Sequence, residues 1–186
     1  STHEGEEEQV LAAHRALLHS HPDALLMLVP RHPQRFDAVA RLIDRSGLVM
    51  ARRSALGVLD ASTPLDAAIS VLLGDSMGEM FVYFAACDLA FVGGSLVPVG
   101  GHNVLEPAAL GVPVLFGPQM HNFVAARELL LDAGAGIEIS ADTLTPRLRE
   151  LFDDPVRRTQ LGAAARAVVA ANRGALQRLL ALLERA

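Results

Sequence analysis

Lysine and tryptophan are absent from this sequence of 186 residues, so all 16 basic side chains are arginines. Without lysine the chain can supply neither the phosphate-binding lysine of a P-loop nor the amine of a Schiff base. The formal net charge of −5 provides no basic surplus for nucleic acid, and we expect no nucleic-acid partner. Arginine is therefore the only strong cation that a ligand site in this chain can use.

Cysteine is also scarce. Cys87 is the only one, and its neighbours Phe84, Ala85, Ala86 and Leu89 favour a buried, unreactive thiol in a reducing compartment. No apolar run approaches the ~18–20 residues needed to cross a bilayer, and the acidic start is not a signal peptide. We expect the chain as given to be soluble. Because it starts inside a motif, we also expect a preceding segment in a longer protein, with any membrane anchor there.

The apolar pattern alternates between strand-like and helical periods, and the length suits a single domain over residues 1–186. Strands are expected at 24–29, 48–51, 68–73, 89–92, 112–116 and 136–139. Helices are expected at 4–20, 33–45, 77–86, 104–110, 122–131, 144–152, 155–171 and 175–185, with a turn at 62–66. This order predicts right-handed crossovers and an α/β, Rossmann-like parallel sheet with helices on both faces and a helical tail from about residue 142.

Two glycine pairs stand between the strand at 89–92 and the following helix. Gly93/Gly94 and Gly100/Gly101 let the backbone adopt positive φ and approach a ligand, and the polar residues His102 and Asn103 open the helix. The same glycines can also do no more than form a tight turn between a strand and a helix. The loop is a candidate phosphate site on the first interpretation and a connection on the second.

Three further polar blocks follow expected strands, namely Arg31/His32, 74–79 and 117–122. Since the carboxyl ends of parallel strands share one edge, all four blocks can converge on one crevice. Arg31 can bind a phosphate or carboxylate through two parallel hydrogen bonds, or it can be a surface arginine paired with an acid. His32 can assist or can be merely solvated.

Two glutamates at helix starts allow two interpretations each. Glu79 can cap its helix or lie beside a nucleotide, and Glu106 can form a capping box with Asn103 or accept hydrogen bonds from ribose hydroxyls. His102 and Glu106 have i, i+4 spacing, but no third ligand follows, so we expect no metal. Ser95 lacks the second flanking glycine of a nucleophile elbow, which argues against a serine hydrolase.

Four blocks of the sequence resemble the bacterial transferases of 3-deoxy-D-manno-octulosonic acid (Kdo). They are 91–107 (FVGGSLVPVGGHNVLEP) with 108–118 behind it, 1–8 (STHEGEEE), 28–36 (LVPRHPQRF) and 73–80 (LGDSMGEM). The resemblance covers essentially the whole chain, and it implies the C-terminal, donor-binding half of a two-domain GT-B glycosyltransferase. Nothing in the sequence resembles the N-terminal, acceptor-binding half of that family.

The resemblance implies roles for individual residues. The nucleotide and donor would be bound by Arg31, His32, Met77, Gly78, Glu79, Gly101, His102, Asn103 and Glu106. The block at 1–8 would follow the first strand of the domain, with His3 and Glu6 facing the transferred sugar, and Asn122 is a possible cap or sugar contact. The resemblance implies a metal-independent enzyme without a cofactor, whose general base is an acid of the other half.

The function implied is transfer of Kdo from CMP-Kdo to a lipid A precursor in lipopolysaccharide core biosynthesis. The full-length enzyme would act at the cytoplasmic face of the inner membrane and bind the lipid through its N-terminal domain, whereas residues 1–186 alone would be inactive. Two alternatives stay open: a related GT-B transferase or epimerase that uses a UDP-sugar, and a non-catalytic nucleotide-binding module. The PRHP and GDSMGE blocks at 30–33 and 74–79 favour the first interpretation.

Overall fold

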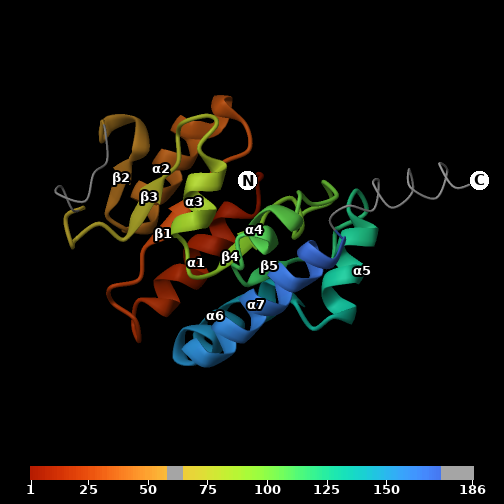
Figure 1. Ribbon diagram of the computed structural model, residues 1–186. Helices are drawn as coiled ribbons and strands as arrows, with labels where there is room; N and C mark the ends of the chain where they lie inside the picture. Colours follow the sequence, from red (N-terminus) through yellow and green to blue (C-terminus); the bar gives the residue numbers. More distant parts are fainter. Residues whose placement is uncertain (58–64, 173–186) are drawn as a thin grey trace, which may run out of the picture.

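Parallel strands alternate with helices in the computed structural model, which describes residues 1–57 and 65–172 (Figure 1). The strands are β1 (Leu26–Leu28), β2 (Met50–Arg52), β3 (Val71–Leu73), β4 (Ala90–Val92), β5 (Val114–Phe116) and β6 (Gly136–Glu138). The α-helices are α1 (Glu7–Leu17), α2 (Phe36–Ser46), α3 (Met80–Ala86), α4 (Leu105–Ala109), α5 (Val124–Asp132), α6 (Ala141–Asp153) and α7 (Pro155–Asn172). The expected α/β class with parallel strands is confirmed. The helix expected at 175–185 and most of the turn at 62–66 lie outside the described residues.

The strands form two parallel sheets of three rather than the single sheet that the sequence suggested. Their orders are β1-β3-β2 and β4-β5-β6, so β1 and β4 are both edge strands. An isolated parallel bridge between Thr2 and Pro30 continues the first sheet beyond β1. It consists of the Thr2 N–H donating to the Val29 carbonyl and the Arg31 N–H donating to the Thr2 carbonyl, each at 2.9 Å.

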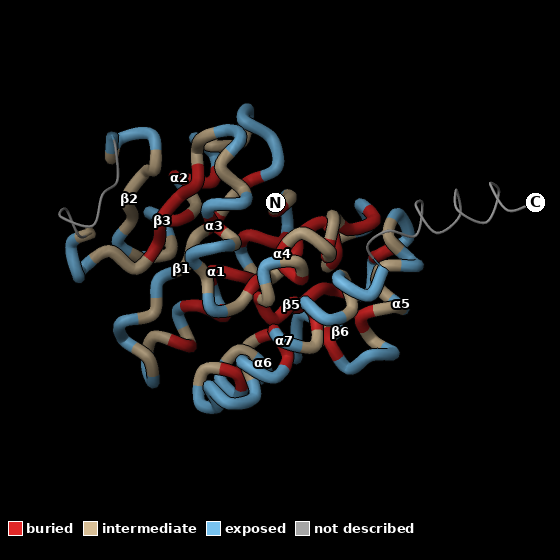
Figure 2. Tube along the Cα trace, viewed as in Figure 1, coloured by how far each residue is buried: buried red, intermediate tan, exposed pale blue. Residues whose placement is uncertain are grey.

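The central strands are apolar because helices cover them. β3 (Val71–Leu73) and β5 (Val114–Phe116) are buried at every position, as parallel strands between two helical layers should be (Figure 2). In the registers, Leu28 lies opposite Leu73 and Val92 lies opposite Phe116. These buried strands fix the positions of the loops that follow them.

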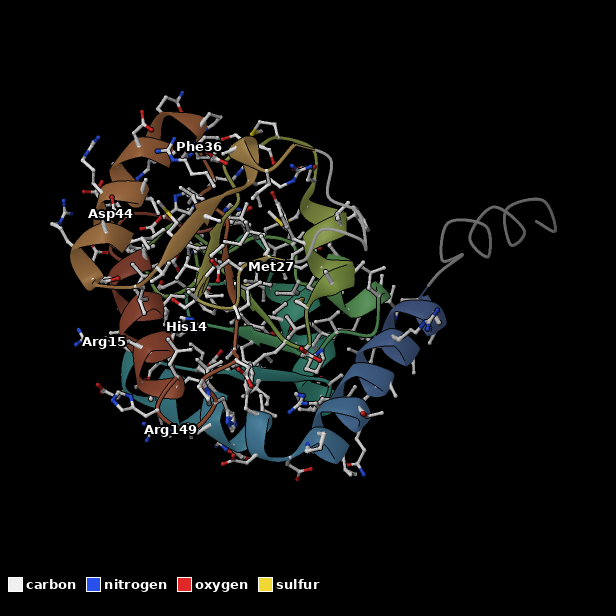
Figure 3. All side chains as sticks on the ribbon, turned by 90° about the vertical axis from the view of Figure 1, so that its left-hand side faces the viewer. His14, Arg15, Met27, Phe36, Asp44 and Arg149 are labelled. Atoms are coloured by element: carbon white, nitrogen blue, oxygen red, sulfur yellow. The ribbon has the colours of Figure 1, made fainter. Side chains whose placement is uncertain are left out.

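Helices pack on the sheets in two groups. α1 contacts α2 and α6, and α4 contacts α3 and α7. The Arg149 guanidinium of α6 donates to the Ala16 carbonyl of α1 at 2.9 Å, and Figure 3 shows Arg149 beside that helix. Apolar residues of α1 and α6, including Leu11 and Leu144, share one core cluster with β1 and β3. α1 is thereby held against both the first sheet and the C-terminal helices.

Candidate functional site

Loops of both sheets lie at the carboxyl ends of the strands. Arg31 and His32 follow β1, the segment 74–79 follows β3, the glycine loop 93–101 follows β4, and 117–122 follows β5. In open parallel sheets this edge is where ligands bind.

The glycine loop 93–101 needs glycine at defined positions. Gly94, Gly100 and Gly101 have φ of +70°, +106° and +76°. A Cβ on Gly100 would lie 2.2 Å from Nδ2 of Asn122, and one on Gly101 would lie 2.2 Å from Sδ of Met120. A larger residue at either position would therefore push aside side chains of the 117–122 loop, in addition to the strain of positive φ.

Glu6 holds the glycine loop through hydrogen bonds from backbone N–H groups to its carboxylate. Its side chain is fully buried, and its carboxylate accepts hydrogen bonds from the backbone N–H groups of Gly94 (2.7 Å), Ser95 (3.0 Å) and Leu96 (2.9 Å). It also accepts the His3 N–H at 3.0 Å. The sequence interpretation had Glu6 facing the sugar; the structure instead places it under the loop, because four N–H donors compensate the cost of burying its charge.

Ser95 and Asn122 also hold the glycine loop through hydrogen bonds. The Ser95 hydroxyl donates to the Val92 carbonyl at 2.6 Å and accepts the Gly117 N–H at 2.8 Å. Asn122 donates its backbone N–H to Gly100 and its Nδ2 to Val99, both at 3.1 Å. Asn122 thus fastens one loop to the other, and its contact with a sugar stays a prediction.

Three histidines gather beside the glycine loop. Nε2 of His3 lies 2.8 Å from Nε2 of His102, with the rings stacked at 5.1 Å, and the His32 ring meets His3 edge-on at 5.5 Å. Burial, followed by the neighbouring His3, Arg31 and His32, lowers the pKa of His102 to about 4. Burial likewise lowers the pKa of His3. A shared Nε2 hydrogen bond requires one donor and one acceptor, so at least one of these two rings is neutral.

Arg31 is exposed next to this imidazole cluster (His3, His32 and His102). Within residues 1–57 and 65–172, no hydrogen bond or ion pair engages its guanidinium. By contrast, Arg35 on the same segment makes a two-pronged contact with the buried Glu7, at 2.6 and 3.3 Å. Arg31 is therefore available to an anion, while Arg35 has a structural partner.

Glu106 contacts the Asn103 side chain, but the two residues do not form the expected capping box, because Val104 is the N-cap of α4 and makes no side-chain cap. The Asn103 Oδ1 accepts the Leu105 N–H at 3.0 Å, and its Nδ2 donates to Oε1 of Glu106 at 3.2 Å. This arrangement holds the start of α4, which is only five residues long. No hydrogen bond within the described part of the chain uses Oε2 of Glu106, so this oxygen can still accept one from a ligand hydroxyl.

The segment 77–79 takes part in a separate network. Glu79 accepts from Arg53 at 2.7 Å, from the Tyr83 hydroxyl at 3.3 Å and from the Ser76 hydroxyl. The Ser76 hydroxyl, followed by the Arg53 guanidinium, lowers the pKa of Glu79. Met77 is 63% exposed. No hydrogen bond or ring contact links this network to the imidazole cluster in the part of the chain that is described.

Sequence reasoning missed Arg53 and Tyr83, the partners of Glu79. Arg53 is 26 residues away from Glu79, and nothing in the spacing of the sequence indicates that the two meet. Helix α3 also begins at Met80 and not at Met77, so the N–H groups of 77–79 precede its first turn.

Three other expectations can be compared with the structure. Cys87 is half-buried, and burial raises the pKa of its thiol to about 11, as expected for an unreactive cysteine. Among the described residues, no three His, Cys, Asp or Glu side chains are grouped as a metal ion would need. None of the helices in residues 1–57 and 65–172 has the length and hydropathy to span a bilayer.

Comparisons with known proteins point in one direction. The chain is 44% identical over 186 residues to the 3-deoxy-D-manno-octulosonic acid transferase of Haemophilus influenzae and 43% identical over 191 residues to that of Bordetella pertussis. Each alignment covers 99% of this chain but only 42% and 43% of those relatives, so the chain spans less than half their length. No family model matches the sequence.

Solved structures extend the comparison to the fold. The C-terminal CMP-Kdo binding domain of WaaA from Acinetobacter baumannii superposes with a TM-score of 0.82 at 36% identity, covering 91% of this chain and 86% of that domain. WaaG, a glycosyltransferase involved in lipopolysaccharide biosynthesis, shares the fold at a TM-score of 0.58 and 17% identity. The chain therefore belongs to the 3-deoxy-D-manno-octulosonic acid transferase family and corresponds to its C-terminal domain.

Proposed function

We propose that this protein binds CMP-Kdo, and that it is the donor-binding half of an enzyme that transfers Kdo to a lipid A precursor. The domain of WaaA to which it is similar is described as CMP-Kdo binding, which supports the donor. The curated relatives are Kdo transferases of more than twice this length, which supports the reaction.

One observation in the structure carries the proposal. The unpaired guanidinium of Arg31 lies beside the His3–His102 pair, of which at least one ring is neutral, and a glycine loop at the carboxyl edge of the strands. CMP-Kdo presents a phosphodiester and a carboxylate, and both are anions that a guanidinium binds through paired hydrogen bonds. A site with one free arginine and imidazole N–H donors beside it suits such a ligand.

Each residue can be given a part in the reaction. The bond between the anomeric carbon and the phosphate oxygen breaks while the acceptor hydroxyl bonds to that carbon, and CMP leaves. Arg31 would stabilise the charge that develops on the phosphate. His102 would donate a hydrogen bond to the anion without carrying charge, and Oε2 of Glu106 would accept one from the ribose. The general base that deprotonates the acceptor would come from the N-terminal half.

Calorimetry with CMP, UMP and ADP in the presence of EDTA tests the donor. We expect CMP to bind weakly and without metal, and more tightly than either of the other nucleotides. Arg31→Ala should abolish the heat of CMP binding, while Arg45→Ala, which removes an exposed arginine at the end of α2, should leave it unchanged. No heat from CMP at millimolar concentration, a preference for UMP or ADP, or binding that requires magnesium would refute the proposal.

The acceptor and the place of action belong to the same proposal. The lipid A precursor would be held by the N-terminal half, and the full-length enzyme would work at the cytoplasmic face of the inner membrane. The described part of this chain has no basic amphipathic helix that could bind an anionic glycolipid, and the formal net charge of the chain is negative. Membrane contact is therefore assigned to the full-length enzyme.

A further inference from the structure

Two consecutive glutamates at the start of α1 each hold one segment of the candidate site. Glu6 accepts N–H groups of the glycine loop, which follows β4 of the second sheet. Glu7 binds Arg35, which ends the segment 30–35 that follows β1 of the first sheet. Both glutamate side chains are fully buried. The first turn of α1 therefore joins the segment that carries Arg31 to the glycine loop.

The carboxylate of Glu7 accepts hydrogen bonds on both oxygens. Its Oε1 accepts from Nη1 of Arg35 at 2.6 Å and from the Thr2 hydroxyl at 3.0 Å, and its Oε2 accepts from Nη2 of Arg35 at 3.3 Å. A guanidinium bound through two parallel hydrogen bonds is fixed in direction as well as in distance. Because a buried charge without partners is costly, the fold favours the arrangement in which both donors stay bound to Glu7.

The same contacts enclose the backbone of Arg31. On one side, the Arg31 N–H donates to the Thr2 carbonyl at 2.9 Å. On the other side, the Arg35 N–H donates to the His32 carbonyl at 2.9 Å within a 3₁₀ turn. Arg31 thus lies between Thr2 and Arg35, and both of these residues are bound to Glu7. If Arg35 leaves Glu7, the backbone of Arg31 loses one of these two attachments.

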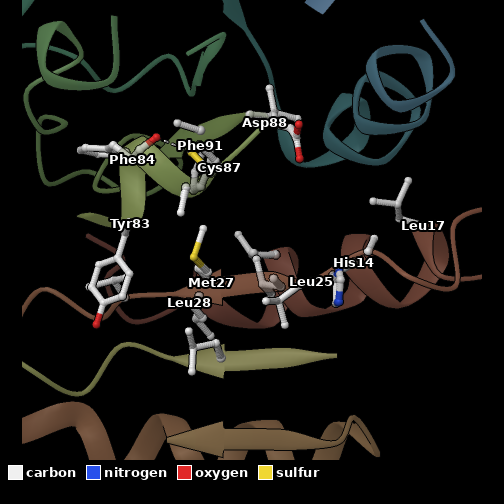
Figure 4. Close-up of a pocket in the computed structure, with 18 of the residues that line it drawn as sticks. His14, Leu17, Leu25, Met27, Leu28, Tyr83, Phe84, Cys87, Asp88 and Phe91 are labelled. Carbon is white, nitrogen blue, oxygen red and sulfur yellow. Dashed lines mark hydrogen bonds between the residues drawn. The ribbon is translucent and has the colours of Figure 1, made fainter. Parts of the chain in front are cut away.

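Packing fixes Glu7 itself relative to the first sheet. Val10 and Leu11 of α1 share a core cluster with Leu28 of β1, which is 1% exposed. Figure 4 shows Leu28 and Met27 on β1, and because side chains alternate along a strand, the two lie on opposite faces of it. Closely packed interiors resist displacement, so Glu7 cannot follow a segment that moves away from it.

We propose that Glu7 and Arg35 are positioning residues for Arg31, because they hold its backbone at a fixed distance from the glycine loop that Glu6 binds. A donor with two anionic groups then meets the guanidinium and the loop without first ordering either segment. The Arg35 guanidinium is bound to Glu7, and Glu7 has no exposed surface, so both act through Arg31. The inference rests on the proposed binding of the donor by Arg31.

Three substitutions in the 186-residue chain test this arrangement in NMR titrations with CMP. Arg35→Lys keeps the charge but replaces two parallel hydrogen bonds by one point contact, and Glu7→Gln removes the charge that both donors bind. Each should weaken CMP binding about tenfold, which is the loss of one hydrogen bond to a charged group. Arg149→Lys is the matched control and should leave the CMP affinity unchanged, because Arg149 holds the opposite end of α1 through the Ala16 carbonyl (Figure 3).

Hydrogen exchange distinguishes positioning from a general effect on stability. The Arg31 amide is bonded to Thr2 and the Gly94 amide to Glu6, so the two amides report on the two segments separately. Arg35→Lys and Glu7→Gln should speed exchange at Arg31 by roughly fivefold or more and leave exchange at Gly94 within about twofold. Arg149→Lys should leave the ratio of the two exchange rates unchanged.

Two results would overturn the inference while the proposed function stands. One is a CMP affinity that is unchanged in Arg35→Lys and Glu7→Gln although Arg31→Ala abolishes binding. The other is exchange that rises equally at Arg31 and Gly94, since the contacts would then stabilise the domain as a whole. If Arg31→Ala leaves the heat of CMP binding unchanged, the proposed function itself fails, and this inference fails with it. Should Glu7→Gln not fold, Arg35→Lys still decides, because the buried carboxylate keeps a cationic partner.

Discussion

Replacing Glu6 by glutamine should destabilise the domain more than any other conservative change near the site. The carboxylate accepts four backbone N–H groups, two on each oxygen. An amide keeps one acceptor oxygen and turns an NH₂ group toward the other two donors. Hydrogen bonds to a charged group contribute ~1.5–3 kcal/mol each, so losing two of them costs about 3–6 kcal/mol. For a domain of this size, Tm should fall by at least about 6 °C.

Thermal unfolding followed by circular dichroism measures the effect, with Glu8→Gln as the matched control. Glu8 lies in the same acidic stretch but is exposed, and an exposed substitution of this kind changes stability by no more than about 0.5 kcal/mol. If Glu6→Gln lowers Tm no more than Glu8→Gln does, the carboxylate does not anchor the glycine loop. Should Glu6→Gln fail to fold, Glu6→Asp, which keeps the charge but shortens the reach, should show an intermediate loss.

Four further outcomes are expected. Glu106→Gln should weaken CMP binding by about tenfold and leave 2′,3′-dideoxy-CMP nearly unaffected in calorimetry; equal losses accompanied by a lower Tm would assign Glu106 to capping. Because the pKa of His102 is lowered to about 4, the unfolded chain binds more protons than the folded one between about pH 6.5 and 4. The free energy of unfolding should therefore fall as the pH falls through this window. Urea titrations should show a smaller fall for His102→Asn, and a fall as steep as in the unmodified chain would show that the pKa of His102 is not lowered on folding. Gly134→Ala, with positive φ but open space, should cost about 1–2 kcal/mol, and Gly100→Ala should cost more than this, because its Cβ would push aside the Asn122 side chain and break its hydrogen bond to Val99; equal losses in chemical denaturation would refute the collision. Residues 1–186 should form no product from CMP-Kdo and the lipid A precursor, whereas a protein that includes the upstream half should do so, because aligning both reactants accounts for ~7–11 kcal/mol of the barrier; turnover by this chain alone would place the base within it.

The sequence of strands and helices along the chain and the α/β class could be predicted because their signals are local, whereas the division into two sheets was not predicted. Apolar runs such as 71–73 and 114–116 are buried on both faces, and all six expected strands are present, although each is shortened to three residues. The ends of helices were less predictable. The helix expected from residue 144 begins at Ala141, because Ser140 and Thr143 form a capping box that the periodicity of apolar residues does not reveal.

The site was predictable only as a set of separate positions. Arg31, His102 and Glu106 could each be assigned to the carboxyl edge from the strand that precedes them. The contact of His3 with His102 could not, because 99 residues separate the two rings. The burial of Glu6 was missed for the same reason: its acidic neighbours indicate an exposed helix start, and only the folded loop supplies the donors that allow a carboxylate inside.

The hydrogen bonds between Glu6 and the glycine loop have a consequence for folding of the chain during translation. The donors lie 88 to 90 positions further along the chain, and closing a loop of that length costs about 4 kcal/mol of chain entropy. The Ser95 hydroxyl must also receive the Gly117 N–H, so the loop cannot be completed before that residue has left the ribosome. Contacts of such separation form late and slowly. During synthesis the Glu6 carboxylate therefore stays solvated until Gly117 has emerged, and a truncated product ending before Gly117 should lack a structured glycine loop.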